Sequence, residues 1–221
     1  PIAMVEVLSG NNPNRQIELP DGTLVSLNLE TRFSYPEKFD GKTREVNIEG
    51  EAFFEVKPDK SKPFIIHAGN AQIKVLGTSF NVNAYPETKQ VEVIVETGRV
   101  QFSNHADDKH ENDELILTPG DKGTLDCNKQ LMSKTTNQDP NFIAWKTRIF
   151  TFKATPLSKV VDELAKVYKA DIKLASPELG GLLLTSQCNN YSLDFIIEII
   201  KTTFDLDVEQ VGEGYILKAK S

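Results

Sequence analysis

The sequence is poor in the residues that most catalytic and metal sites require. Its 221 residues include three histidines, two cysteines and one tryptophan. No pair of cysteines has the two-residue spacing of a zinc ribbon or a thioredoxin-like site. The phosphate-binding loop, the dinucleotide-binding glycine pattern and the serine-hydrolase elbow are also missing. We therefore expect no turnover of a substrate, no cofactor and no metal.

The chain also lacks a basic cluster and a long apolar run. Its formal net charge is −7, and the missing basic face argues against nucleic-acid binding. No apolar run reaches the roughly 18 residues that a membrane-spanning helix needs. The chain begins at Pro1 and not at Met. This start predicts a piece of a longer protein from which targeting segments were removed.

Histidines and cysteines leave alternatives open. His105 and His110 lie in an acidic stretch that fits a metal site or, more commonly, a solvated hairpin tip. Cys127 and Cys188 would form a disulfide in an oxidising compartment and otherwise remain two unpaired thiols. A nucleophilic serine at Ser26, Ser34 or Ser79 would need one of the few histidines close by.

Carboxylates and aromatic residues suggest two further sites. Glu51 and Glu55 would lie on one strand face about 13 Å apart, which is too far for either glycosidase geometry. We expect a solvated strand face instead. Phe33, Tyr35 and Phe39 form either a platform for a sugar or part of a packed core, and the core is the more common outcome.

Residues 1–135 are predicted to form an all-β domain. Short β-branched or alternating runs are separated by turn dipeptides such as Asp21-Gly22, Glu49-Gly50 and Thr97-Gly98, as in a β-sandwich, barrel or solenoid. The runs lie at 16–19, 24–27, 46–48, 53–56, 64–66, 73–76, 80–82, 91–95, 99–102 and 115–117. Glycines that recur at similar intervals fit a solenoid repeat or ordinary turns. These are Gly22, Gly50, Gly77, Gly98 and Gly123.

A polar, proline-containing segment at 136–147 predicts a linker to a second domain at 148–221. Two amphipathic helices are expected there, one capped by Thr155 with Pro156 at its first position and one capped by Ser192. Strands are expected at 148–152, 171–174, 182–187, 206–211 and 215–218. The order is β-α-β-β-α-β-β, a βαββαβ-type α+β domain with both helices on one face of a small sheet.

The Gly77-Thr78 dipeptide carries a possible chemistry of its own. In a strained turn, a threonine hydroxyl can attack the carbonyl of the preceding residue and form an ester that water cleaves. The alternative is an ordinary tight turn in which glycine supplies a positive φ.

Taken together, these segments resemble the FecR family of transmembrane anti-sigma regulators. The blocks that carry the resemblance are residues 19–28 (LPDGTLVSLN), Tyr35-Pro36 with Phe39, 46–56 (VNIEGEAFFEV), 62–64 (KPF), 75–82 (VLGTSFNV) with Ala84-Tyr85, 96–100 (ETGRV) and 117–121 (LTPGD). The second half is similar to the secretin/TonB short N-terminal fold that follows FecR in many family members. The residues that carry this second likeness are 145–147, 150–152, Pro156-Leu157, Val160, Leu164, Tyr168 and Ile172.

The resemblance implies the periplasmic region of a single-pass inner-membrane protein. Its partner would be the periplasmic signalling domain of an outer-membrane TonB-dependent transducer. An extracytoplasmic-function sigma factor would be bound only by a cytoplasmic segment that, like the transmembrane helix, this chain does not include. Some family members also cleave themselves at the Gly-Thr that matches Gly77-Thr78.

Function is thus predicted to be signal relay by protein–protein binding. A small sheet offers an edge strand to which a partner can add a strand, and we expect that edge in the last two strands. The contact residues expected there are Leu206, Val208, Val211, Tyr215, Ile216 and Leu217. The alternatives are a glycan-binding β-domain and a regulator that cleaves itself at Gly77-Thr78.

Overall fold

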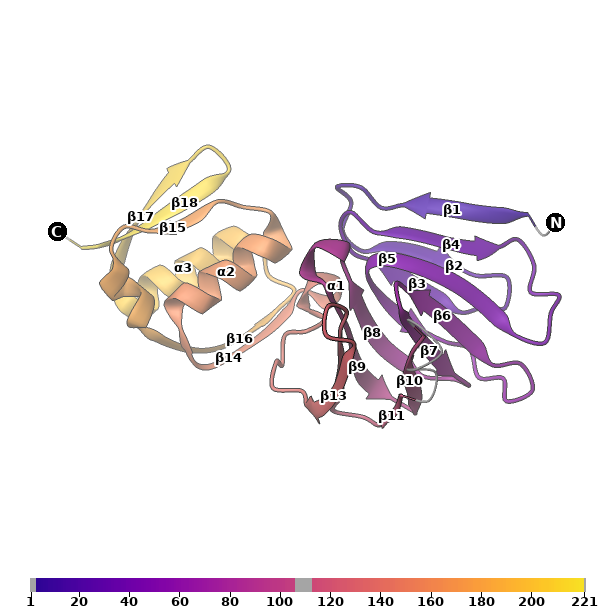
Figure 1. The fold of residues 1–221 in the computed structure, drawn as a ribbon. Helices are drawn as coiled ribbons and strands as arrows, with labels where there is room; N and C mark the ends of the chain where they lie inside the picture. The colour runs from indigo at the N-terminus through magenta and orange to yellow at the C-terminus, as the bar shows by residue number, and fades with distance from the viewer. Residues whose placement is uncertain (1–2, 106–112, 221) are drawn as a thin grey trace. The chain divides into compact units, whose positions relative to one another are not determined.

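The chain folds into two compact units in a computed structural model that describes residues 3–105 and 113–220. The first unit runs to Phe142 and the second begins at Ile143 (Figure 1). Ala144–Thr147, which we placed in the linker, form the short helix α1 of the second unit. No helix of the described part is long and apolar enough to span a membrane.

In the described part of the first unit, thirteen strands belong to one continuous sheet. They are β1 (Met4–Leu8), β2 (Arg15–Glu18), β3 (Leu24–Leu27), β4 (Arg32–Pro36), β5 (Arg44–Glu55), β6 (Phe64–Ala68), β7 (Ala71–Val75), β8 (Ser79–Ala84), β9 (Gln90–Thr97), β10 (Val100–Asn104), β11 (Glu114–Leu117), β12 (Asp121–Asp126) and β13 (Leu131–Thr136), with a short 3₁₀ turn at η1 (Pro86–Thr88).

Strand β5 belongs to both halves of this sheet. Its first part pairs with β4 and β6, and its second part, from Gly50 on, pairs with β3 and β8. One half has the order β1-β4-β5-β6-β7-β10-β11, and the other β2-β3-β5-β8-β9-β12-β13. Among the described strands of this unit, neighbours pair antiparallel except β5 with β6. A solenoid stacks parallel strands, so this pairing excludes a solenoid. The two half-sheets share β5 and enclose one core, which makes a twisted sandwich.

The predicted turn at Glu49-Gly50 is wrong, because these residues lie inside β5. Gly50 has φ +118°, and a Cβ atom there would lie 2.5 Å from the Thr31 Oγ1 atom and 2.7 Å from the Thr31 Cα atom. The Thr31 hydroxyl accepts a hydrogen bond from the Glu51 N–H at 2.9 Å. Glycine is therefore needed where the strand passes from one half-sheet to the other.

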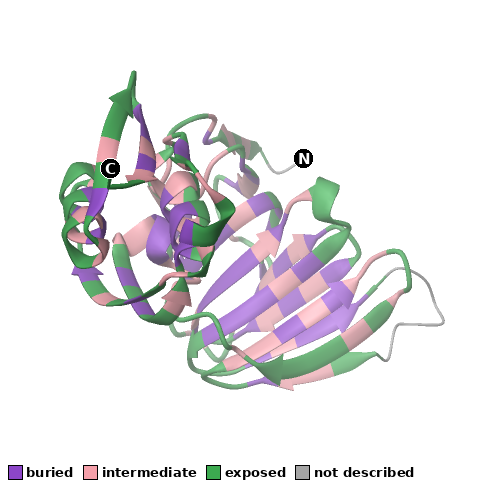
Figure 2. Ribbon diagram, turned by 90° about the vertical axis from the view of Figure 1, so that its left-hand side faces the viewer, coloured by how far each residue is buried: buried purple, intermediate pink, exposed green. Residues whose placement is uncertain are grey.

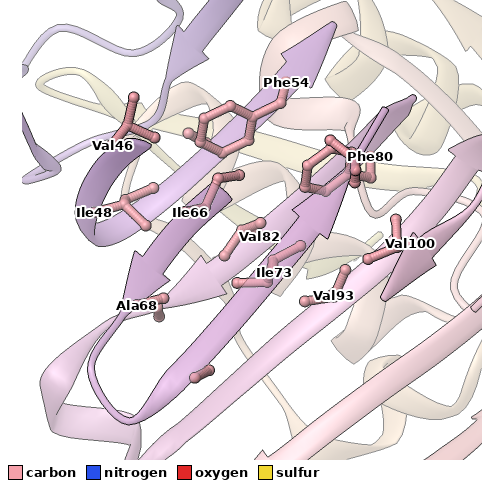
Figure 3. Packing of buried hydrophobic residues seen from close by; sticks show 14 of the residues in the cluster. Val46, Ile48, Phe54, Ile66, Ala68, Ile73, Phe80, Val82, Val93 and Val100 are labelled. Carbon is pink, nitrogen blue, oxygen red and sulfur yellow. The ribbon is translucent and has the colours of Figure 1, made fainter. Parts of the chain in front are cut away.

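The core of the first unit lies between the two half-sheets. Strand β5 alternates buried and exposed residues over its first half, as the strand period requires. Figure 2 shows bands of buried and more exposed residues along the strands of the large sheet. Phe54 stacks on Phe80 with ring centroids 5.4 Å apart. Side chains of both halves meet in this cluster, among them Val46, Ile66, Ile73, Val82, Val93 and Val100 (Figure 3).

The second unit has the predicted element order. It consists of α1, β14 (Ile149–Pro156), α2 (Leu157–Tyr168), β15 (Ile172–Leu174), the 3₁₀ turn η2 (Pro177–Gly181), β16 (Leu183–Asn189), α3 (Leu193–Phe204), β17 (Leu206–Val211) and β18 (Gly214–Ala219). The fold class, mainly β followed by a smaller α+β part, is confirmed.

The prediction of one sheet with both helices on one face is wrong. The described strands form a two-stranded sheet, β14-β16, and a three-stranded sheet, β15-β18-β17. Figure 1 shows α2 and α3 between these two sheets, and α2 contacts strands of both. The first strands of the two βα units pair with each other and the later strands form the second sheet. The apolar helix faces are thereby covered on two sides.

The two predicted helix caps differ in outcome. Ser192 caps α3 and accepts a hydrogen bond from the Phe195 N–H at 3.3 Å. Thr155 does not cap α2, whose N-cap residue is Pro156. The Thr155 hydroxyl instead accepts the Lys153 N–H at 3.1 Å, because β14 continues through this residue to Pro156.

We predict that Gly50→Ala lowers the free energy of unfolding of the first unit by at least about 2 kcal/mol, since the new Cβ atom meets Thr31 and the backbone is strained. Urea denaturation measures the change. Gly41→Ala is the control, because a Cβ atom there has only ordinary contacts, at 3.8 Å or more. Equal stability of the two variants would contradict the role assigned to Gly50.

Candidate functional site: the Gly77-Thr78 turn and the β17 edge

The Gly77-Thr78 turn joins β7 to β8 and has a conformation that only glycine accepts readily. Gly77 has φ +152°, and a Cβ atom there would lie 2.7 Å from the Cα atom of Pro58 and 2.8 Å from its Cβ atom. A positive φ favours glycine, and the closeness of Pro58 excludes any side chain. The turn is therefore packed directly against the loop 57–62.

Two backbone hydrogen bonds hold the turn against Val56 and the loop 57–62 that follows it. The Val56 N–H donates to the Thr78 carbonyl at 3.0 Å, and the Asp59 N–H donates to the Leu76 carbonyl at 2.8 Å. These bonds flank Gly77 on both sides. The peptide bond between Gly77 and Thr78 is thus fixed by its neighbours and not by its own turn alone.

The Thr78 hydroxyl is buried and points toward the next turn of the sheet. The residue is 4% exposed, and its hydroxyl donates to the Arg99 carbonyl at 3.1 Å. A Cβ atom on Gly98 would lie 2.9 Å from Thr78 Oγ1 and 3.0 Å from the Gly77 carbonyl oxygen. The hydroxyl and the carbonyl it would attack therefore lie on the same side, facing Gly98.

A groove of about 590 Å³ opens beside this turn. Its walls include Gly77 and Thr78 together with the cationic side chains of Lys74 and Arg99. Solvent can therefore approach the Gly77-Thr78 bond from this side. The hydroxyl, the preceding carbonyl and an open groove therefore lie together at this turn.

The other histidine, serine and cysteine candidates do not form a site. His67 Nε2 lies 3.1 Å from Glu45 Oε2, and among the described residues no hydrogen bond joins a histidine to Ser26, Ser34 or Ser79. His105 is exposed, and His110 lies outside the described residues. The two thiols, at Cys127 and Cys188, are free. No cluster able to hold a metal ion is found in the described part.

The aromatic residues proposed as a sugar platform belong to the core of the first unit. Phe33 is buried, and Tyr35 and Phe39 pack against the same cluster. Phe33 and Tyr35 have ring centroids 5.6 Å apart. Rings packed in this way do not present a flat exposed face for a sugar to stack on.

Glu51 is not on a solvated face, and the prediction for it was wrong. Its carboxylate accepts the Asn28 side-chain amide at 2.7 Å and the Asn81 side-chain amide at 2.8 Å. Burial raises the pKa of Glu51 above its ordinary value of 4.5, although these amide bonds oppose the shift. The alternating pattern predicts the face on which Glu51 lies but not the polar partners that cover it.

The expected docking edge is present in part. In the three-stranded sheet β17 is at the edge, whereas β18 lies between β15 and β17, so the prediction that both strands form the edge was wrong for residues 215–218. Parallel pairing with β15 occupies the second side of β18. Three of the expected contact residues are buried in the core: Leu206, Tyr215 and Leu217. Val211 is 54% exposed, and Val208 and Ile216 are partly buried.

Family models match both units of the chain. A family model described as FecR protein matches residues 5–101, and a second one, described as FecR, C-terminal, matches residues 149–217. This chain belongs to the FecR family. The resemblance inferred from the sequence is confirmed, and FecR proteins are membrane-anchored regulators of the anti-sigma type with periplasmic regions. The chain is therefore assigned a regulatory role.

Solved structures support the FecR assignment over the whole chain. Two crystal structures of a candidate anti-sigma factor from Parabacteroides distasonis ATCC 8503, at 2.50 and 1.65 Å resolution, are each 30% identical to this chain with a TM-score of 0.68. The similarity covers 99% and 98% of this chain and 100% of each of those chains. A search of the curated proteins finds no match.

We predict that Glu51→Gln removes a pH dependence from the stability of this FecR unit. With its pKa raised, native Glu51 binds a proton more tightly than in the unfolded chain. Its contribution to stability therefore falls as the pH rises from about 4.5 through the native pKa. Glutamine does not ionise, and rotation of the Asn81 amide, whose oxygen is buried without a partner in the described structure, would accommodate its NH₂ group.

Calorimetric unfolding of the wild type and of Glu51→Gln between about pH 4.5 and 7.5 measures this pH dependence of stability. Glu37→Gln, which changes an exposed glutamate, is the control. A wild-type pH profile in Glu51→Gln would contradict the assignment.

Proposed function

We propose that this chain is the periplasmic sensor region of a transmembrane anti-sigma regulator and works by protein–protein binding. It would receive a signal from the periplasmic signalling domain of an outer-membrane TonB-dependent transducer and relay it to an extracytoplasmic-function sigma factor. The observation that carries the proposal is the FecR unit followed by a small α+β unit with an open edge strand.

Strand addition at β17 is the docking mode that the second unit supports best. A partner strand gains affinity from main-chain hydrogen bonds to an exposed edge. Of the two outer strands of the three-stranded sheet, β17 has six residues and β15 has three. The residues of β17 from Glu209 to the turn are exposed, so a longer ladder is available at this edge.

The hairpin geometry identifies the backbone groups that would receive a partner. Two residues connect β17 to β18, and Val211 pairs with Gly214 at the turn. In such a hairpin the closing pair is hydrogen-bonded, and residues at alternate positions point their N–H groups outward. The N–H groups of Val208 and Gln210 therefore face the open edge.

We predict that Gln210→Pro weakens binding of the transducer signalling domain by about tenfold or more, because one outward donor is lost and the ring blocks the ladder. Isothermal titration of the two proteins measures it. Gln210→Ala changes the same side chain and keeps the N–H, so its affinity should stay that of the wild type. Unchanged affinity of a folded Gln210→Pro variant would exclude docking at this edge.

Proline at Ile216, one of the expected contact residues, would not test docking. Strand β18 pairs on both sides, so proline there would disrupt the sheet itself.

We infer a second activity for the same chain, self-cleavage between Gly77 and Thr78. Thr78 Oγ attacks the Gly77 carbonyl carbon, and an ester bond forms as the C–N bond breaks. The hydroxyl proton goes to the Thr78 nitrogen, which becomes the free amine. Water then hydrolyses the ester to give the Gly77 carboxylate and restores the threonine hydroxyl. The positive φ of Gly77 and the buried hydroxyl of Thr78 support this reaction.

Cleavage at this bond would leave the first unit assembled. Strands on either side of the cut pair with each other, β5 with β8 and β7 with β10. The two pieces therefore share one sandwich, and only a denaturing measurement distinguishes cut from uncut protein.

We predict that intact-mass analysis under denaturing conditions finds fragments ending at Gly77 and beginning at Thr78. Thr78→Ala should be a single species because the nucleophile is removed, whereas Thr78→Ser keeps a hydroxyl and should still be cut. A single uncut species in the wild type would exclude self-cleavage, and equal cutting of Thr78→Ala would point to a contaminating protease.

A further inference from the structure

Arg44, the first residue of β5, is a buried cation with a specific set of partners. It is 2% exposed. Its Nη1 atom lies 2.6 Å from Asp21 Oδ2 and donates to the Lys57 carbonyl at 2.9 Å, and its Nε atom donates to the Lys62 carbonyl at 2.8 Å. The guanidinium also lies over the ring of Phe64, 5.3 Å from the centroid. One side chain thus joins the start of β5 to both ends of the loop 57–62.

A second set of contacts strengthens the hold on the first residue of this loop. Asp21 Oδ2 accepts the Thr23 hydroxyl at 2.7 Å, and Thr23 Oγ1 accepts the Lys57 N–H at 3.1 Å. Both backbone groups of Lys57, its N–H and its carbonyl, are therefore bound within the network of Asp21, Thr23 and Arg44. The carboxylate compensates the buried charge, which alone would be costly.

The loop held in this way is the one that packs on the Gly77-Thr78 turn. Pro58 follows Lys57 directly and lies against Gly77. The N–H of Asp59, the next residue, donates to the Leu76 carbonyl. Arg44 itself does not touch the turn. It fixes the loop, and Pro58 and Asp59 of the loop contact the turn.

We propose that Arg44 is a positioning residue for self-cleavage: through the loop 57–62 it holds the Gly77-Thr78 peptide in the conformation from which Thr78 attacks. The inference rests on the proposed self-cleavage. It makes the geometry of the cleavage site depend on Arg44, a buried cation at the start of β5. Arginine is required for this role, because its planar fork reaches two carbonyls and a carboxylate at once, whereas the single ammonium group of lysine cannot reproduce that geometry.

The first measurement tests how firmly the loop 57–62 is held on the turn, in a protein that cannot cleave itself. In the Thr78→Ala background we compare amide hydrogen exchange with and without Arg44→Lys. The Val56 and Asp59 amides, which bond the two carbonyls flanking Gly77, should exchange about tenfold faster in the Arg44 variant. Amides of strands β9 and β12 should keep their protection.

The second measurement follows cleavage in the full chain with Thr78 present. Arg44→Lys should lower the rate of cutting after Gly77 by about tenfold or more, because small displacements of a reacting pair reduce rates steeply. Val93→Ala removes buried methyl groups from β9, which does not contact the Arg44 network in the described structure, and is the control for lost stability. Its cleavage should remain that of the wild type.

Pro58→Gly is a second test at the loop itself. It leaves the Arg44–Asp21 pair in place and removes the proline ring that lies against Gly77. It should therefore also lower the rate of cleavage, even if Arg44→Lys does not fold. Wild-type cleavage in folded Arg44→Lys or in Pro58→Gly would overturn the positioning role and leave self-cleavage intact. An uncut wild type would overturn both. Equal loss in Val93→Ala would reduce Arg44 to a general stabilising residue and overturn the proposal.

Discussion

The sharing of β5 between the two half-sheets is the constraint on which the first unit depends. A strand that crosses from one sheet to the other must change direction without breaking its ladders, and Gly50 allows this with a positive φ against Thr31. Two contacts around the Gly77-Thr78 turn begin from the same strand. Arg44 stands at its beginning, and Val56, which bonds the Thr78 carbonyl, follows directly after its end.

Polar side chains on this strand and in the Gly77-Thr78 turn make specific contacts. Arg44, Glu51 and Thr78 each bind named partners within the first unit. A buried polar group without such partners would be costly, so each network restricts its neighbours to one arrangement. In the case of Thr78, that arrangement places a hydroxyl and the preceding carbonyl on one side of a turn.

The second unit follows a different logic, in which two helices are covered by two small sheets. Small sheets have a high proportion of edge strands, and an edge that is not covered offers unpaired backbone donors and acceptors. The first unit thus concentrates buried internal contacts around one peptide bond, whereas the second leaves a ladder open. Under the proposed function, the first unit would hold the cleavable bond and the second unit would bind the partner.

Local patterns in the sequence determined much of this protein. The absence of catalytic motifs, the alternating runs, the cap at Ser192 and the order of elements follow from residue type and period, which act over a few neighbours. The predicted runs at 46–48 and 53–56 were both strands, yet no local signal showed that they are one strand bent at Gly50. Only the tertiary structure decided that β18 is central, that Glu51 is covered by two asparagines, and that Arg44 reaches the carbonyls of Lys57 and Lys62. These features depend on pairings between segments distant in the chain, and a one-dimensional pattern indicates which face a residue occupies but not what lies opposite it.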